Sequence, residues 1–482
     1  MQNRTYDRIQ AIFVSNKRWV VALAVVGLCL AMGTIGGWLI AYLGPLFTAA
    51  LVIALVGGML MLRSAQFGFM ALIGVICLLP FGALPIEIGF TPTFLNVVLG
   101  VLFAIWLAQV VTGHQKGFVT SPLALPIVIF LFLAFVSFVA GLAHAPPTPN
   151  AIRRFAEIVM GITLFFVTVN CVRTRKELEQ LVLVIILAGF VEALIGVVLY
   201  FLPQALSVRL LSALRIFNYP AGWGVLRFIR DDPRLPMRAI GTSVDPNILG
   251  GLLILVTSLT VPQLFTRRPL FKRWLAVPIL AVMGLCMILT FSRGSMFGLG
   301  CALALLAVVR YRRLLPMLIA TGLLVLLLPQ TREYVMHFAQ GVRFQDLASQ
   351  MRLGEYKDAL ILIRRYPLIG VGFIGAPDID IYLGVSSLYL LIAEEMGLVG
   401  LGVFLVIMAI FFRYTWRSWK GMEHDPRLEA ILLGFETAVV GGLIGGILDH
   451  YLFSFPHAVA FFWLYVGLAV VAARLARESG PE

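Results

Sequence analysis

Three arginines stand at the edges of long apolar segments, and they are the residues of this sequence best suited to chemistry. Arg154 opens one such segment, Arg238 shortly precedes another, and Arg293 lies between two segments with almost no loop. In the segment after Arg238, Asp245 is expected to cap a helix whose first residue is Pro246. A cation at that depth is costly unless it extends to lipid headgroups or binds an anion. Because a guanidinium group binds phosphate oxygens in a bidentate way, these side chains could hold a phosphate and stabilise it as a leaving group.

Acidic residues offer a second kind of chemistry. Asp378-Ile379-Asp380 matches the short DxD pattern with which nucleotide-sugar transferases hold a divalent ion. Cytosolic nucleotide sugars would be absent on the outer face, where the topology described below places this segment, so we expect no metal site. Other ionisable residues fall within apolar segments, where we expect structural pairing with arginine rather than a proton relay. They are Glu192, Glu394, Glu395, Glu436 and, near the end of a segment, Asp449 with His450.

Helices that span a membrane must position these residues. Hydrophobic residues make up 60% of the 482 positions and the mean hydropathy is +0.97, which leaves too little polar surface for a soluble fold. About fourteen apolar runs of roughly 18 to 25 residues recur along the chain, and each is long enough to cross a bilayer as a helix. Among them are the runs at about 244–263, 274–291 and 294–310. We therefore predict an all-α, polytopic transmembrane helical bundle that forms a single integral membrane domain over residues 1–482.

The net charge of +13 could suggest a nucleic-acid partner. The cations, however, sit in short clusters between apolar runs, as expected of loops that stay in the cytoplasm. With the N-terminus inside, the clusters around 173–176, 267–273, 310–313 and 413–420 all fall on the cytoplasmic side. The charge pattern thus predicts cytoplasmic N- and C-termini and no nucleic-acid binding.

Two loops are much longer than the others, at about 203–243 and 330–386, and both fall on the outer side of the predicted topology. The first holds six arginines, no lysine and two aspartates. Long loops cross a membrane regardless of charge, but the exclusive use of arginine favours phosphate binding. In the second loop, Leu353, Tyr356, Leu360 and Ile363 fall on one stripe, which predicts an amphipathic helix over 352–365 that Pro367 ends.

Three motifs in the second half of the chain resemble the O-antigen ligase and polymerase superfamily of bacterial membrane glycosyltransferases, over about residues 150–470. They are Arg238-Ala-Ile-Gly-Thr-Ser-Val-Asp-Pro-Asn247, Phe291-Ser-Arg-Gly294, and Arg352-Leu-Gly-Glu-Tyr-Lys-Asp-Ala-Leu360 followed by Tyr366-Pro-Leu-Ile-Gly-Val-Gly372. The resemblance implies a GT-C-like fold of about twelve spans, a bacterial inner-membrane location and an undecaprenyl-pyrophosphate-linked glycan as donor. It also implies metal-independent transfer without a cofactor, and an acceptor hydroxyl activated in the large outer loop.

The sequence departs from the family pattern at one position. Ligases of this family carry His, then Asn, Ser or Gln, then nine residues and Gly-x-x-Gly, whereas here Ser386-Ser387 and Gly397-Leu-Val-Gly400 fill the frame. A hydroxyl cannot accept a proton near neutral pH as imidazole does. The departure favours a polysaccharide polymerase over a ligase that acts on lipid A core.

We therefore interpret the chain as a polymerase-like transferase that moves a glycan from undecaprenyl pyrophosphate onto a lipid-linked glycan. Arg238 and Arg293, supported by Arg154 and Arg352, are expected to bind the donor pyrophosphate. Membrane lipid surrounds the protein, and a flippase and a chain-length regulator are expected partners. The base is open among Ser386, Glu355, Asp358, Asp378, Asp380 and His337. The alternatives are a ligase, a transporter of small anions, and an assembly scaffold without catalysis.

Overall fold

The computed structural model divides the chain into two compact units, residues 1–64 and 65–482. It describes residues 64–84, 91–113, 117–144, 146–327, 347–374, 384–419, 422 and 425–478, together with scattered positions between 19 and 61. The elements discussed below all belong to the second unit.

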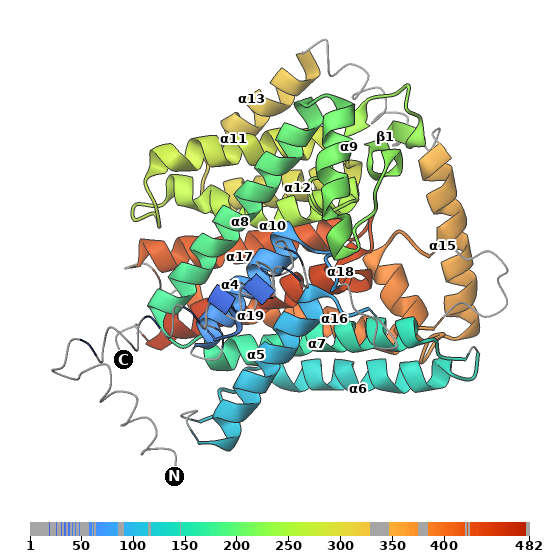
Figure 1. Cartoon of the computed structure of the whole chain (residues 1–482). Helices are drawn as coiled ribbons and strands as arrows, with labels where there is room; N and C mark the ends of the chain where they lie inside the picture. Colours follow the sequence, from blue (N-terminus) through green and yellow to red (C-terminus); the bar gives the residue numbers. More distant parts are fainter. Residues whose placement is uncertain are drawn as a thin grey trace. The chain divides into compact units, whose positions relative to one another are not determined.

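Helices make up almost all of this unit (Figure 1). In chain order they are α4 (Ala65–Leu78), α5 (Phe94–Val111), α6 (Ala124–Gly141), α7 (Pro149–Cys171), α8 (Arg175–Phe201), α9 (Gln204–Ala213), α10 (Pro246–Phe265), α11 (Arg273–Leu289), α12 (Arg293–Val309), α13 (Leu314–Leu327), α15 (Leu347–Arg365), α16 (Leu388–Ser418), α17 (Pro426–Gly445), α18 (Tyr451–Ser454) and α19 (Pro456–Glu478). Among the described residues, seven of these helices are long and apolar enough to cross a membrane: α5, α6, α8, α10, α16, α17 and α19. The predicted all-α, polytopic membrane fold is thereby confirmed.

Local sequence signals set the ends of the spans. Asp245 caps α10 by accepting hydrogen bonds from the backbone of Asn247 and Ile248, and Pro246 is the first helical residue, both as predicted. A capping box of Thr174 with Glu177 begins α8. Because such signals act over a few residues, the predicted spans 244–263, 274–291 and 294–310 agree closely with α10, α11 and α12.

The segment between α8 and α10 corresponds to the first long loop of the prediction and has structure of its own. After α9 come three short 3-10 helices, η1 (Leu214–Phe217), η2 (Trp223–Val225) and η3 (Ile229–Asp231). A small antiparallel hairpin pairs β1 (Arg227–Phe228) with β2 (Met237–Arg238), so that Arg227 lies opposite Arg238. The hairpin is attached to the bundle, because Ala239 donates a backbone hydrogen bond to Leu289 at the end of α11.

A break in α16 explains two of the sequence motifs. Gly397 has φ +70° inside this helix, and the segment 367–372 runs along the interruption. The backbone of Val371 and Gly372 donates hydrogen bonds to the carbonyl groups of Glu394 and Glu395, which the break frees from the helical pattern. The Tyr366–Gly372 motif therefore binds, through its backbone, the helix break at which the Gly-x-x-Gly frame begins.

The predicted amphipathic helix is present as α15, which ends two residues before Pro367. In Figure 1 it lies at the right-hand edge of the drawing and runs across the direction of α6 and α7. Within this helix Ala359 and Leu362 are buried, whereas Leu353 and Leu360 of the predicted stripe are exposed. The face that is buried depends on contact with α16, which hydropathy alone does not reveal.

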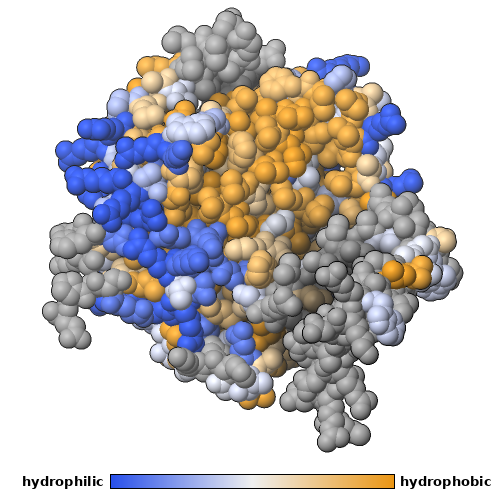
Figure 2. Space-filling view, turned by 60° about the vertical axis from the view of Figure 1, so that its left-hand side comes forward, coloured by the Kyte–Doolittle hydropathy of each residue, from blue (hydrophilic) through white to orange (hydrophobic). Residues whose placement is uncertain are grey.

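The surface of the molecule is apolar to an extent that fits a membrane environment. Figure 2 shows one face on which hydrophobic side chains form a broad continuous area, with most of the hydrophilic side chains at its left and a few at its upper right. Apolar side chains exposed on the helices include Phe132 on α6 at 64% and Val308 on α12 at 66%. An exposed apolar area of this kind is stable when hydrocarbon surrounds it.

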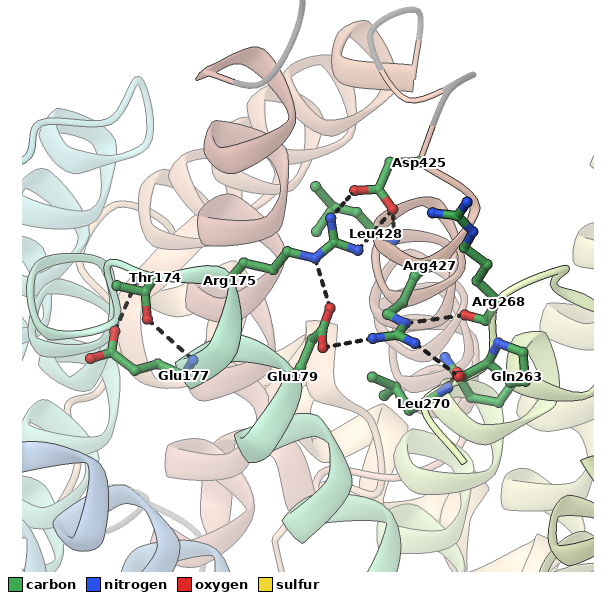
Figure 3. Close-up of polar contacts among 11 residues, drawn as sticks. Thr174, Arg175, Glu177, Glu179, Gln263, Arg268, Leu270, Asp425, Arg427 and Leu428 are labelled. Atoms are coloured by element: carbon green, nitrogen blue, oxygen red, sulfur yellow. Dashed lines mark hydrogen bonds and ion pairs between the residues drawn. The ribbon is translucent and has the colours of Figure 1, made fainter. Parts of the chain in front are cut away.

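An ion-pair network lies at the end of the bundle where α8 begins and α10 ends (Figure 3). Arg175 of α8 binds Glu179 and Asp425, and Arg427 of α17 donates a hydrogen bond to Glu179 at 3.1 Å. Arg427 also donates to the carbonyl group of Arg268 in the loop between α10 and α11. The network therefore joins the start of α8, the loop between α10 and α11, and the start of α17.

Candidate functional site

A pocket at the opposite end of α10 brings together three of the four arginines predicted to bind pyrophosphate. Its volume is about 140 Å³, well above the roughly 10–15 Å³ that one water needs. The described residues that line it are Ile229, Arg230, Arg238, Asn247, Phe291, Arg293 and Arg352. We call this the arginine pocket. Four of its seven described lining residues are arginines and none is acidic, so it is a strongly cationic site.

Separate elements contribute each arginine. Arg238 ends the hairpin, Arg293 begins α12, and Arg352 projects from α15. Arg230 lies in η3 and has φ +57°, an unfavourable backbone conformation for a residue with a side chain. Phe291, just before α12, has φ +53°. Two strained backbone positions thus line the same pocket, as is common where structure serves function.

Arg238 is held by two hydrogen bonds. Its Nε donates to the carbonyl group of Thr290 at 2.8 Å, and its Nη2 donates to Oδ1 of Asn247 at 2.9 Å. These bonds connect the end of α11 with the first turn of α10. Burial, and to a smaller extent the charge of Arg352, lower the pKa of Arg238 to about 10. The guanidinium group nevertheless stays charged at neutral pH.

Helix ends add to the positive potential. Asn247 lies in the first turn of α10 and Arg293 is the first residue of α12, and both line the arginine pocket. The N-terminus of a helix carries partial positive charge and favours a nearby anion. The pocket therefore combines four guanidinium groups with two helix N-termini, an arrangement that suits a phosphate-bearing ligand.

The other predicted site residues are distributed differently. Arg154 is exposed on α7 and is not among the described lining residues of the arginine pocket. Glu355 accepts a hydrogen bond from the backbone of Ser386 at 3.0 Å, so two of the candidates for the base are neighbours. Asp358 is half-buried on α15. His337, Asp378 and Asp380 lie outside the described residues.

Two residues that line the pocket, Arg230 and Asn247, were not singled out from the sequence. Arg230 was one of six arginines in a basic loop, and Asn247 was the last residue of a motif. Arg230 shared only the general expectation that the arginines of this loop bind phosphate, and Asn247 was not predicted to bind a ligand. The signal for Asn247 was its place directly after the Asp245-Pro246 cap, in the first turn of a helix that begins at this surface. Arg230 carries no comparable signal, because a tertiary turn with positive φ directs it to the pocket.

The expectation that membrane-buried carboxylates pair with arginine is wrong for Glu192. This fully buried residue of α8 accepts hydrogen bonds from the backbone of Thr242, from the Thr242 hydroxyl and from the Ser243 hydroxyl, at 2.8, 2.8 and 3.1 Å. A Cβ atom at Gly241 would lie 2.3 Å from Oε1 of Glu192. Three successive residues of the segment after Arg238 therefore pack directly on this carboxylate.

Glu192 is expected to position that segment. Glu192→Ala should lower both thermal stability and the affinity for the pocket ligand, because it leaves the Thr242 N–H without an acceptor, at a cost of about 1–3 kcal/mol. Glu192→Gln keeps an acceptor oxygen and should stay close to wild type. Thermal unfolding in detergent and ligand titration of both variants would check this. Equal behaviour of the Ala and Gln variants would rule out the positioning role.

The fold and the pocket define a polytopic helical membrane protein with an arginine-lined cavity at one end of the bundle. Residues 278–405, which include most of α11 and all of α12 and α15, match the family model described as O-antigen ligase. Over this segment the match supports the resemblance of the chain to the O-antigen ligase and polymerase superfamily.

Two curated proteins share shorter stretches with the chain. An undecaprenyl-diphosphatase of Rhodopseudomonas palustris (strain BisB18) is 38% identical over 109 residues, which are 19% of this chain and 40% of that protein. An undecaprenyl-diphosphatase of Rhodopseudomonas palustris (strain BisA53) is 35% identical over 69 residues, 13% of this chain and 25% of the relative. The chain thus spans less than half the length of either relative.

Proposed function

We propose that this protein is a polymerase-like membrane glycosyltransferase that moves a glycan from undecaprenyl pyrophosphate onto a lipid-linked glycan acceptor. The observation that carries the proposal is the arginine pocket. Its four guanidinium groups suit the two phosphates of such a donor, and its place at the end of the bundle suits a headgroup whose lipid tail stays in the membrane. The family match supports a membrane glycosyltransferase.

In the proposed reaction, a hydroxyl oxygen of the acceptor forms a bond with the anomeric carbon of the donor glycan. The bond from that carbon to the phosphate oxygen breaks, and its electron pair leaves with undecaprenyl pyrophosphate. Arg238, Arg293 and Arg352, with Arg230 beside them, stabilise the charge that develops on this leaving group. The names of the two partial relatives refer to the same lipid pyrophosphate, which is consistent with such a donor.

The proposal includes an orientation and a setting. Both termini lie in the cytoplasm, and the arginine pocket opens on the outer side of a bacterial inner membrane, as the positive-inside pattern of the loops indicates. A flippase would supply the donor on that side, and a chain-length regulator would limit the product. A transporter would instead keep its ligand site near the membrane midplane, between repeated halves.

A purified and reconstituted protein should lengthen an undecaprenyl-pyrophosphate-linked oligosaccharide in excess EDTA, because guanidinium groups, rather than a metal ion, stabilise the leaving pyrophosphate. Product lengths on a gel would check this, with a manganese-dependent nucleotide-sugar transferase as the control for chelation. Complete loss of transfer in EDTA, restored by manganese, would instead favour a metal site at Asp378 and Asp380. Transfer to lipid A core but not to the lipid-linked glycan would identify a ligase.

A further inference from the structure

The loop between α17 and α18 is attached to the position where ligases of the family carry histidine. The backbone of Leu388 donates hydrogen bonds to the carbonyl groups of Gly446 and Asp449, at 2.7 and 3.0 Å. Leu388 is only two residues from Ser386, which replaces that histidine. The loop and the start of α16 therefore form one continuous piece of structure.

Helix α15 makes a second attachment at the same place. The Tyr356 hydroxyl lies 3.1 Å from the carbonyl oxygen of Ser386 and 3.4 Å from that of Ile447. Tyr356 is one turn from Arg352, which lines the arginine pocket. Position 386, the loop and the pocket are thus linked through a single helical turn.

His450 ends this loop, and its ring is fixed. Its Nδ1 lies 2.6 Å from the Ser454 hydroxyl oxygen, which itself donates to the His450 carbonyl group at 3.0 Å. Because a hydroxyl has one hydrogen, this geometry assigns the ring proton to Nδ1 and leaves the lone pair on Nε2 as an acceptor. The ring also stacks on Phe455, with centroids 6.0 Å apart.

The charged groups that act on His450 come from several helices that meet at the site. They are Glu355 and Arg352 of α15, Arg154 of α7, and Asp245 at the cap of α10. Asp449, the preceding residue, accepts a hydrogen bond from the His450 backbone at 2.9 Å. Burial lowers the pKa of His450, so its imidazole is neutral and able to accept a proton at pH 7.

We propose that His450 is the general base that activates the acceptor sugar hydroxyl, and that it replaces the histidine that ligases hold at the position of Ser386. The inference rests on the proposed function. As the acceptor oxygen attacks the anomeric carbon, its proton passes to Nε2 of His450, and the electron pair of the broken bond leaves with the lipid pyrophosphate. The resulting imidazolium returns the proton to solvent after the product departs.

His450→Gln should lower kcat about 10²- to 10⁴-fold and leave the donor KM unchanged, because the arginine pocket remains intact. His144→Gln is the matched control, since that histidine is exposed and should not affect transfer. Adding Ser386→His to His450→Gln should raise kcat at least tenfold above that of His450→Gln, because it returns an imidazole to the adjacent position. A merely structural role of His450 would not allow this rescue.

Several results would overturn the inference. One is transfer by His450→Gln within about twofold of wild type; another is a larger loss of kcat in Glu355→Gln than in His450→Gln. If His450→Gln does not fold, Ser454→Ala keeps the histidine and should still lower kcat severalfold at constant donor KM, and an unchanged kcat would contradict the role. Failure of the wild-type protein to use any lipid-pyrophosphate donor would overturn the proposed function itself.

Discussion

Replacing Arg238 by lysine should lower the rate of glycan transfer by about two to three decades, the usual cost of removing a preorganised donor from a leaving-group site. Lysine has one compact ammonium group, so it cannot bind the Thr290 carbonyl group and Asn247 in the way that Nε and Nη2 of Arg238 do. The orientation that directs the remaining donors into the pocket would be lost.

The loss should also depend on pH in a direction that the structure sets. The burial that lowers the pKa of Arg238 to about 10 leaves arginine fully charged at pH 8.5. The same burial acts on a lysine whose ordinary pKa is only about 10.4, so the variant starts to lose its charge as the pH rises. The ratio of variant to wild-type kcat should therefore fall between pH 6.5 and pH 8.5.

Measuring kcat for both proteins across this range would test the prediction. Arg209→Lys is a suitable control, because Arg209 is exposed on α9 and does not line the arginine pocket. A constant ratio, or a rate for Arg238→Lys equal to that of Arg209→Lys, would show that Arg238 does not act through its charge on a bound pyrophosphate.

Local signals made much of this fold predictable. The Asp245-Pro246 cap, the short junction before Arg293 and the stop at Pro367 each depend on a few neighbouring residues, and each was predicted at the position where it occurs. The apolar runs in turn require helices, because a backbone in hydrocarbon must satisfy its own hydrogen bonds. Fold class and most boundaries follow from these two facts.

Tertiary contacts decide what the sequence could not show. The break at Gly397 is stable because the segment 367–372 binds the freed carbonyl groups, and nothing near Gly397 in the sequence reveals that partner. Glu192 lies fifty residues before Thr242 in the chain, so its partners were not foreseeable either. Likewise, Arg230 reaches the arginine pocket only through a turn with positive φ.

Arg293 lines the arginine pocket at the start of α12, and only three residues separate it from the end of α11. A single conservative substitution can test its role. Arg293→Lys keeps the charge but replaces a planar set of donors, so a bidentate hold on a phosphate should be lost while a simple contact with lipid headgroups should survive.

We therefore expect Arg293→Lys to cost about 2–4 kcal/mol in the transition state, or roughly one and a half to three decades in rate. Arg293→Ala should reduce transfer further. Both variants should insert and express as wild type does, which membrane fractionation would check beside the transfer assay. Transfer by Arg293→Lys at the wild-type rate would mean that Arg293 only anchors the helix end at the membrane surface, and the pyrophosphate would then have to bind elsewhere than in the arginine pocket.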